Sequence, residues 1–232
     1  MKVRDYSQFE RMLNEFVGNG DPDDPKALKR TRILKAATEL FIHHGYRKTS
    51  ISEVAARAGM AKGTVYLYFA NKPELLVYAI AEEKKRYVDR LRPILSTERP
   101  PQERLKAWLK MVFVTGSEMP LTSKVLAGDR DLLNALYDYM DAHQEQNIET
   151  LQEEFIVHLV SEALGPHCLT DTELRDRAKV LWGVIYFSLA IADPRVRRGL
   201  SLERFADLFA TMIVDGIGAA GGAEARPKDE EV

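Results

Sequence analysis

"TSISEVAARAGMAKGTVYLYF", residues 49–69, predicts two short helices joined by a glycine turn. Ser50 and Glu53 have the spacing of a capping box, in which the serine hydroxyl accepts a hydrogen bond from an amide three residues on and the glutamate carboxylate accepts one from the serine amide. Gly59 suits the positive φ that a tight turn between two crossed helices requires. The stretch therefore predicts a helix-turn-helix, whose second helix, over residues 61–69, would lie in the major groove of DNA.

The second short helix has an inner and an outer face. Val65 and Phe69 lie four residues apart and are expected to face inward, together with Phe41, Ile51 and Val54. The outer face carries Lys62, Thr64, Leu67 and Tyr68, with Tyr66 toward one edge, and Gly63 would allow a close approach to a backbone. Lysine and tyrosine can donate to phosphates, and threonine offers a hydroxyl and a methyl group to base edges. The tyrosines are therefore expected to bridge a small core and DNA.

Longer helices are expected on both sides of this motif. The helix over 26–44 ends at Gly45, and the helix over 72–92 begins after Asn71 and ends before Pro93. Lys72 lies in the first turn of the later helix, where its ammonium group and the free amides suit a phosphate.

The charge of the chain is unevenly distributed. Residues 26–77 carry ten Lys and Arg against three acids, a balance of +7, in a chain whose net charge is −2. A basic block in an otherwise acidic chain is typical of a module that binds a polyanion, although a solvated charged face has the same composition.

Almost every other segment also has helical periodicity, and no strand or hairpin pattern occurs. Further helices are expected at about 101–118, 121–127, 130–164, 171–192 and 201–217. We predict an all-α chain with an N-terminal extension bearing an amphipathic helix (1–25), a three-helix domain with the helix-turn-helix (26–72), a larger helical body (73–218) and a disordered tail (219–232).

Residues 30–76 resemble the DNA-binding domain of the TetR family of bacterial transcriptional regulators. The resemblance rests on Gly45-Tyr46, Thr49-Ser50, Glu53-Val54-Ala55, Ala58-Gly59, Lys62-Gly63-Thr64-Val65-Tyr66, Phe69, Lys72 and Leu75-Leu76. Ala61 stands where the family usually has serine, and Leu67 stands where a polar or aromatic residue is common.

This resemblance implies roles for individual residues. Phosphate contacts are expected from Ser50, Tyr66 and Lys72, and base or near-base contacts from Lys62, Thr64 and Leu67. Three further cations, Lys29, Arg30 and Arg32, are expected either to reach phosphates or an adjacent minor groove, or to remain solvated surface charges.

The resemblance also implies a homodimer formed by the last two helices of each subunit. Apolar residues cover more than one face of both helices, which fits a partner interface or a thick core. The predicted interface residues are Trp182, Tyr186, Ala190, Phe205, Leu208, Phe209 and Met212. Two reading helices ~34 Å apart would recognise a palindrome in double-stranded DNA.

In the family, a small-molecule effector binds within the body and shifts the helix that here spans 72–92. Candidate lining residues are Trp108, Met111, Val112, Met119, Leu136, Tyr137, Met140, Phe155, Trp182 and Phe187, each of which also suits an ordinary core. Their aromatic and methionine content suggests an apolar or amphipathic effector. Repression is the common mode of the family and is expected here.

Other classes of function receive less support from the sequence. The sequence has no HExxH, GxSxG, P-loop or GxGxxG motif and no Cys/His group with zinc spacing, so we expect no enzyme, no cofactor and no metal site. An adaptor whose body binds another protein would draw support from the amphipathic segment at residues 5–17. The single Cys168, the charged start of the chain and the short apolar run at 182–192 predict a soluble cytoplasmic protein with no membrane span.

Overall fold

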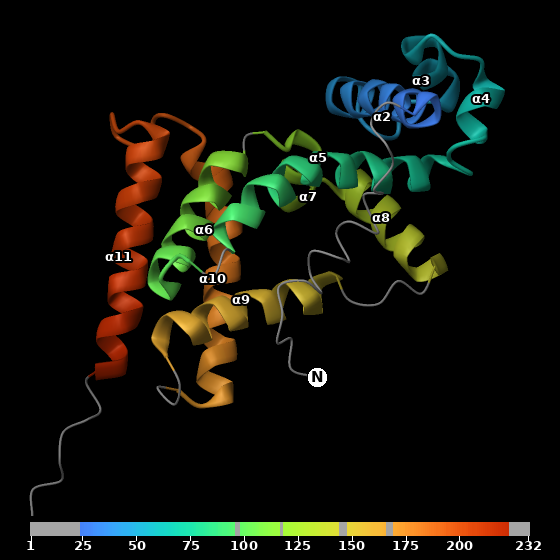
Figure 1. The fold of residues 1–232 in the computed structure, drawn as a ribbon. Coiled ribbons are helices and arrows are strands. Elements are labelled where there is room, and N and C mark those ends of the chain that lie inside the picture. The colour runs from blue at the N-terminus through green and yellow to red at the C-terminus, as the bar shows by residue number, and fades with distance from the viewer. Residues whose placement is uncertain (1–23, 96–97, 117, 144–147, 166–168, 223–232) are drawn as a thin grey trace, which may run out of the picture. The chain divides into compact units, whose positions relative to one another are not determined.

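The computed structural model describes residues 24–95, 98–116, 118–143, 148–165 and 169–222, and these residues form ten α-helices and no strand (Figure 1). The helices are α2 (Pro25–His43), α3 (Ile51–Ala58), α4 (Lys62–Tyr66), α5 (Lys72–Ile94), α6 (Pro101–Gly116), α7 (Pro120–Leu126), α8 (Arg130–His143), α9 (Ile148–Leu164), α10 (Asp171–Ile191) and α11 (Leu202–Gly222). The predicted all-helical fold is confirmed.

The contacts between helices divide the chain into two compact units. The described parts of residues 24–89 and 116–148 form the first unit, and those of 90–115 and 149–222 form the second. The helix-turn-helix segment lies in the first unit.

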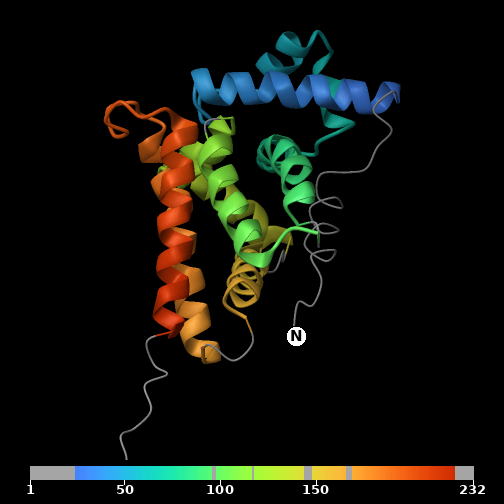
Figure 2. The ribbon, with the colours of Figure 1, turned by 60° about the vertical axis from the view of Figure 1, so that its left-hand side comes forward.

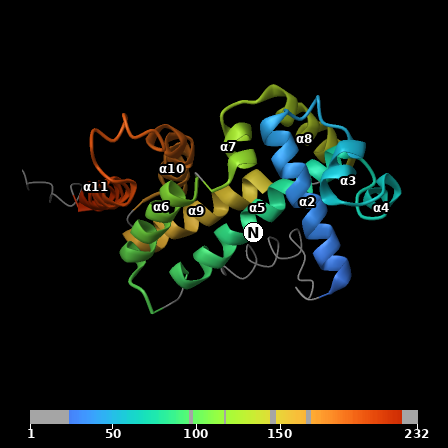
Figure 3. The same cartoon turned by 90° about the horizontal axis from the view of Figure 1, so that it is seen from above.

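The core of the first unit joins the helix-turn-helix to the start of α5. α2 packs against α3, and α3 packs against α4 (Figure 3). The side chains expected to face inward are buried: Phe41, Ile51, Val54, Val65 and Phe69 are all exposed by 9% or less. The same core continues through Ile33, Leu34, Ala37, Leu75, Leu76, Leu121 and Leu132. Burial of this continuous apolar face holds α4 against the other helices of the first unit.

The expected single helix over 130–164 is wrong, because the structure has α8 and α9 in its place. Residues 144–147 between them are not described. α8 lies in the first unit, whereas α9 from residue 149 onward lies in the second, so their apolar faces are buried in different cores. The segment "QEQN" contains neither glycine nor proline, and its composition therefore did not signal a helix end.

The second short helix is also shorter than expected, since α4 covers only Lys62–Tyr66. The amides of Leu67 and Tyr68 donate to the carbonyls of Thr64 and Val65, which are i→i+3 bonds of a closing turn. Leu67 therefore caps α4 and keeps a helical backbone conformation.

Two helices extend past their expected ends. α5 includes Pro93 in its last turn, and α11 continues to Gly222, so residues 219–222 of the predicted tail are helical.

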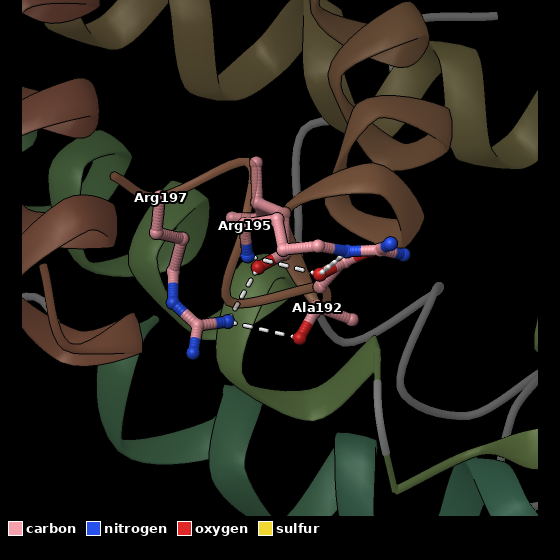
Figure 4. Close-up of polar contacts among 5 residues, drawn as sticks. Ala192, Arg195 and Arg197 are labelled. Carbon is pink, nitrogen blue, oxygen red and sulfur yellow. Dashed lines mark hydrogen bonds and ion pairs between the residues drawn. The ribbon is translucent and has the colours of Figure 1, made fainter. Parts of the chain in front are cut away.

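In the second unit, α10 and α11 run antiparallel to each other (Figure 2). Phe187 and Phe209 join them, with ring centroids 5.4 Å apart. Arg197, in the connection, donates through Nη1 to the carbonyls of Ile191 (2.6 Å) and Ala192 (2.9 Å), and thus satisfies acceptors at the end of α10 (Figure 4).

No helix within the described ranges combines the length and the apolar composition that a membrane span needs. The predicted N-terminal helix at 5–17 and Cys168 lie outside the described residues.

Candidate nucleic-acid interface

The first helix of the motif, α3, begins with the predicted capping box. The amide of Glu53 donates to Ser50 Oγ (3.2 Å), and the amide of Ser50 donates to Glu53 Oε2 (2.7 Å). Hydrogen bonds with Ser50 lower the pKa of the Glu53 carboxyl, and the bond with the Ser50 backbone has a larger effect than the bond with its side chain. The start of α3 is therefore fixed while the Ser50 residue itself remains exposed.

The turn from α3 to α4 depends on Gly59 and Arg32. Gly59 has φ 67° and ψ 41°, the left-handed conformation expected for it. Arg32 on α2 donates from Nη2 to the carbonyl of Ala58 (2.8 Å), one residue before the glycine. This guanidinium nitrogen thus holds the end of α3 against α2, a contact that the sequence did not reveal.

The outer face of α4 is open to solvent. Lys62, Gly63, Tyr66 and Leu67 are exposed, and Leu67 reaches 84%. Lys62 Nζ lies 5.7 Å from the centroid of the Tyr66 ring. Thr64 and Tyr68 are half-buried, and the Tyr68 side chain packs against the core. Most of the predicted DNA-binding side chains of this helix are thus gathered on one exposed surface.

Lys72, at the start of α5, contacts the loop that precedes α3. Its ammonium group donates to the carbonyls of Tyr46 and Thr49, both at 2.9 Å, and lies 4.4 Å from the centroid of the Tyr46 ring. Burial lowers the pKa of Lys72, while Asp131 and Glu53 act in the opposite direction. Lys72 therefore ties α5 to the helix-turn-helix, and the expected phosphate contact stays a prediction.

The three cations predicted on α2 have different environments. Lys29 is exposed. The guanidinium carbon of Arg30 lies 4.7 Å from the ring centroid of Tyr78 and 5.6 Å from that of Phe69, which are cation–π distances. Arg32 holds the end of α3, as described above. Lys29 and Arg32 are exposed and Arg30 is half-buried, and the DNA contacts of all three stay predictions.

Another contact missed by the sequence reasoning links α5 to α7. The Glu83 carboxylate accepts from the amides of Leu121 (2.9 Å) and Thr122 (3.0 Å) and from the Thr122 hydroxyl (3.0 Å). Met119 gives α7 no side-chain cap, so Glu83 satisfies its first amides from a different helix. Burial is the largest influence on the Glu83 carboxyl and raises its pKa, against the lowering effect of these hydrogen bonds.

The predicted effector-binding residues fall in both units. Trp108, Met111, Val112 and Phe155 are buried in the second unit, where the rings of Trp108 and Phe155 meet edge to face with centroids 6.2 Å apart. The other candidates there are Trp182, half-buried, and Phe187, exposed. In the first unit, Met119, Leu136 and Met140 are half-buried and Tyr137 is exposed. Their role in binding an effector stays a prediction.

The predicted dimer residues include an exposed apolar set on α10 and α11. Tyr186, Leu208 and Met212 are exposed, Met212 by 74%. Ala190 is also exposed, whereas Trp182, Phe205 and Phe209 are half-buried. Phe209 contacts Phe113 on α6 within the same chain, with centroids 5.1 Å apart. The aromatic cluster therefore belongs partly to the core, and the exposed residues are the stronger interface candidates.

Known proteins share both the motif and the fold. Residues 33–79 match the family model described as bacterial regulatory proteins, tetR family. The fatty acid metabolism regulator protein of Bacillus subtilis is 32% identical over 127 residues, which are 55% of this chain and 59% of that protein. The chain therefore spans less than two thirds of the length of this relative.

Two solved structures illustrate the shared fold. The regulator FadR from Bacillus subtilis in complex with stearoyl-CoA has a TM-score of 0.59 at 18% identity, with 80% of this chain and 98% of that chain covered. AibR in complex with isovaleryl coenzyme A and operator DNA also has a TM-score of 0.59, at 21% identity, with coverage of 79% and 97%. At these identities the likeness establishes the fold alone.

The fold and the exposed face of α4 define a helix-turn-helix DNA-binding protein. Within that class, the chain belongs to the TetR family of transcriptional regulators, as its motif predicted. Proteins of this family regulate transcription and are not enzymes.

Proposed function

We propose that this chain is a ligand-responsive repressor, which binds a palindromic operator as a homodimer and is released by an amphipathic effector. The observation that supports the DNA-binding step most directly is the exposed face of α4, with Lys62, Tyr66 and Leu67 at the surface of a basic segment. The glycine turn and Arg32 fix this helix, which lowers the entropy lost when it enters a groove.

Selection of random duplex DNA on the purified protein at moderate salt tests this step. A palindrome with half-sites about one helical turn apart is expected. Affinity should fall steeply with salt, with a slope of about −0.9 for each phosphate neutralised. A flat salt response together with no enriched sequence would reject the DNA-binding function.

The homodimer is proposed from the exposed apolar residues of α10 and α11. Met212→Glu places a charge at the most exposed of them, and Leu28→Glu places the same charge at an exposed leucine on α2. Sedimentation should show monomers of the Met212 variant at a concentration where the wild type and the Leu28 variant remain dimers, because burial of an unpaired carboxylate is costly. A dimer that persists in the Met212 variant would place the interface elsewhere.

For the effector, we propose an acyl-CoA. The predicted effector-binding residues are largely apolar, and two proteins of the same fold bind stearoyl-CoA and isovaleryl coenzyme A. An effector releases DNA only if it binds the DNA-incompetent state more tightly. We expect one of these two thioesters to dissociate the operator complex, whereas free coenzyme A and the free fatty acid leave it intact. If neither thioester changes operator affinity, the acyl-CoA class is rejected, and DNA binding is unaffected by that result.

A further inference from the structure

The exposed face of α4 ends in an apolar side chain. Thr64 and Leu67 are three residues apart and are therefore neighbours on one side of the helix, which begins after the extended N-cap Ala61. The amide of Leu67 donates to the carbonyl of Thr64 (3.2 Å), so the helical phase of the two side chains is maintained through the cap. This side of α4 thus carries the half-buried Thr64 side chain and the exposed isobutyl group of Leu67.

Leu67 is the outermost of these groups. Its exposed fraction of 84% is the highest of any large apolar side chain among the described residues. The surrounding segment is basic, with a balance of +7 over residues 26–77, and Lys62 is exposed on the same short helix. Charge complementarity therefore favours a polyanion as the surface that covers Leu67, in preference to an apolar protein.

Few of the side chains that usually read bases occur on this helix. Bidentate recognition of guanine uses arginine or lysine, and that of adenine uses asparagine or glutamine; residues 61–68 contain only Lys62 of these types. A purely apolar group can distinguish one base in the major groove, because only thymine presents a C5 methyl group there.

We propose that Leu67 is a specificity-determining residue that packs against the C5 methyl group of a thymine in each half-site of the operator. This inference rests on the proposed DNA-binding function and adds the base that the helix reads. The contact removes about one methyl group and part of the isobutyl group from water.

Uracil, which is thymine without the methyl group, supplies the test. Each thymine of the selected operator is replaced by uracil in turn, and binding of the full chain is measured at one salt concentration. At one thymine position per half-site, the change should weaken binding about fourfold, and about fifteenfold when both half-sites carry it.

The Leu67→Ala variant should lose this sensitivity, with less than about a twofold difference between the thymine and uracil sites. Leu200→Ala shortens another exposed leucine, which lies in the connection before α11, and should keep the full uracil penalty. Thr64→Ser removes the neighbouring methyl group and retains its hydroxyl, so a penalty that persists in this variant assigns the contact to Leu67.

Three results would overturn the inference. These are a selected half-site without thymine, uracil substitutions that all leave affinity unchanged, and a uracil penalty that is equal in the wild type and in Leu67→Ala. In each of these cases a palindrome with a steep salt dependence still supports the proposed function. If no sequence is enriched, operator binding itself is rejected, and the inference is rejected with it.

Discussion

Replacement of Gly59 by alanine tests how the turn before α4 is held. Gly59 has φ 67°, and the left-handed conformation costs alanine about 1–2 kcal/mol relative to glycine. A Cβ at this position would lie 3.2 Å from Arg32 Nη2, which is tighter than an ordinary van der Waals contact. That nitrogen donates to the Ala58 carbonyl, and a charged hydrogen bond contributes about 1.5–3 kcal/mol, of which a small shift removes a part. We expect a total loss of about 2–3 kcal/mol in the free energy of unfolding.

Gly45→Ala is the matched control for the backbone term. Gly45 has φ 85°, and a Cβ there would meet no atom within 4 Å, so this variant should lose only about 1–2 kcal/mol. Urea unfolding of the full chain, followed by circular dichroism, measures both variants. The excess loss at Gly59 should disappear in an Arg32→Ala background, because the displaced nitrogen is absent there. Equal losses at the two glycines, or an excess that survives removal of Arg32, would refute this account of the turn.

Three further predictions address α4 and α5. In Gly63→Ala the new Cβ would meet no atom within 4 Å, so thermal melts should show a fold that is more stable by about 0.5–1 kcal/mol. DNA titrations should show weaker binding if Gly63 permits a close approach of the DNA backbone. Unchanged affinity would exclude that role. Lys72→Met removes the donor to the Tyr46 and Thr49 carbonyls and should cost about 1–3 kcal/mol in urea unfolding, whereas unaltered stability would show that the ammonium does not hold the loop. The pKa of Glu83 is raised, so above the ordinary value of 4.5 the native state binds more protons than the unfolded state. The stability of the wild type relative to Glu83→Gln should therefore fall as pH rises from 4.5 toward the native pKa. A difference in the free energy of unfolding that does not depend on pH would contradict the raised pKa.

The helix-turn-helix was predictable because its determinants are local. Ser50 and Glu53 are three residues apart, and Gly59 needs only its own backbone conformation, so the short-range pattern specified α3 and the following turn. The division between α8 and α9 depends on burial in two different cores, and the four polar residues between these helices carry no local signal for it. Local chemistry was therefore sufficient to predict the helix-turn-helix, whereas the arrangement of the later helices depends on tertiary contacts.

The same distinction applies to the cations of residues 26–77, whose partners within the fold could not be predicted from residue type alone. Lys72 was expected to contact a phosphate, and Arg32 either to reach phosphates or a minor groove or to remain solvated. Their hydrogen-bond partners within the chain are carbonyl oxygens 23–26 residues away in the sequence, and their DNA contacts remain predictions. Arg57 is paired with Glu39, and Arg30 lies over aromatic rings. The balance of +7 over residues 26–77 therefore overstates the number of cations that are available to phosphates, because part of that charge orients the helices that carry the others. Substitution of such a residue would weaken DNA binding by moving α4, even where its side chain never touches a phosphate.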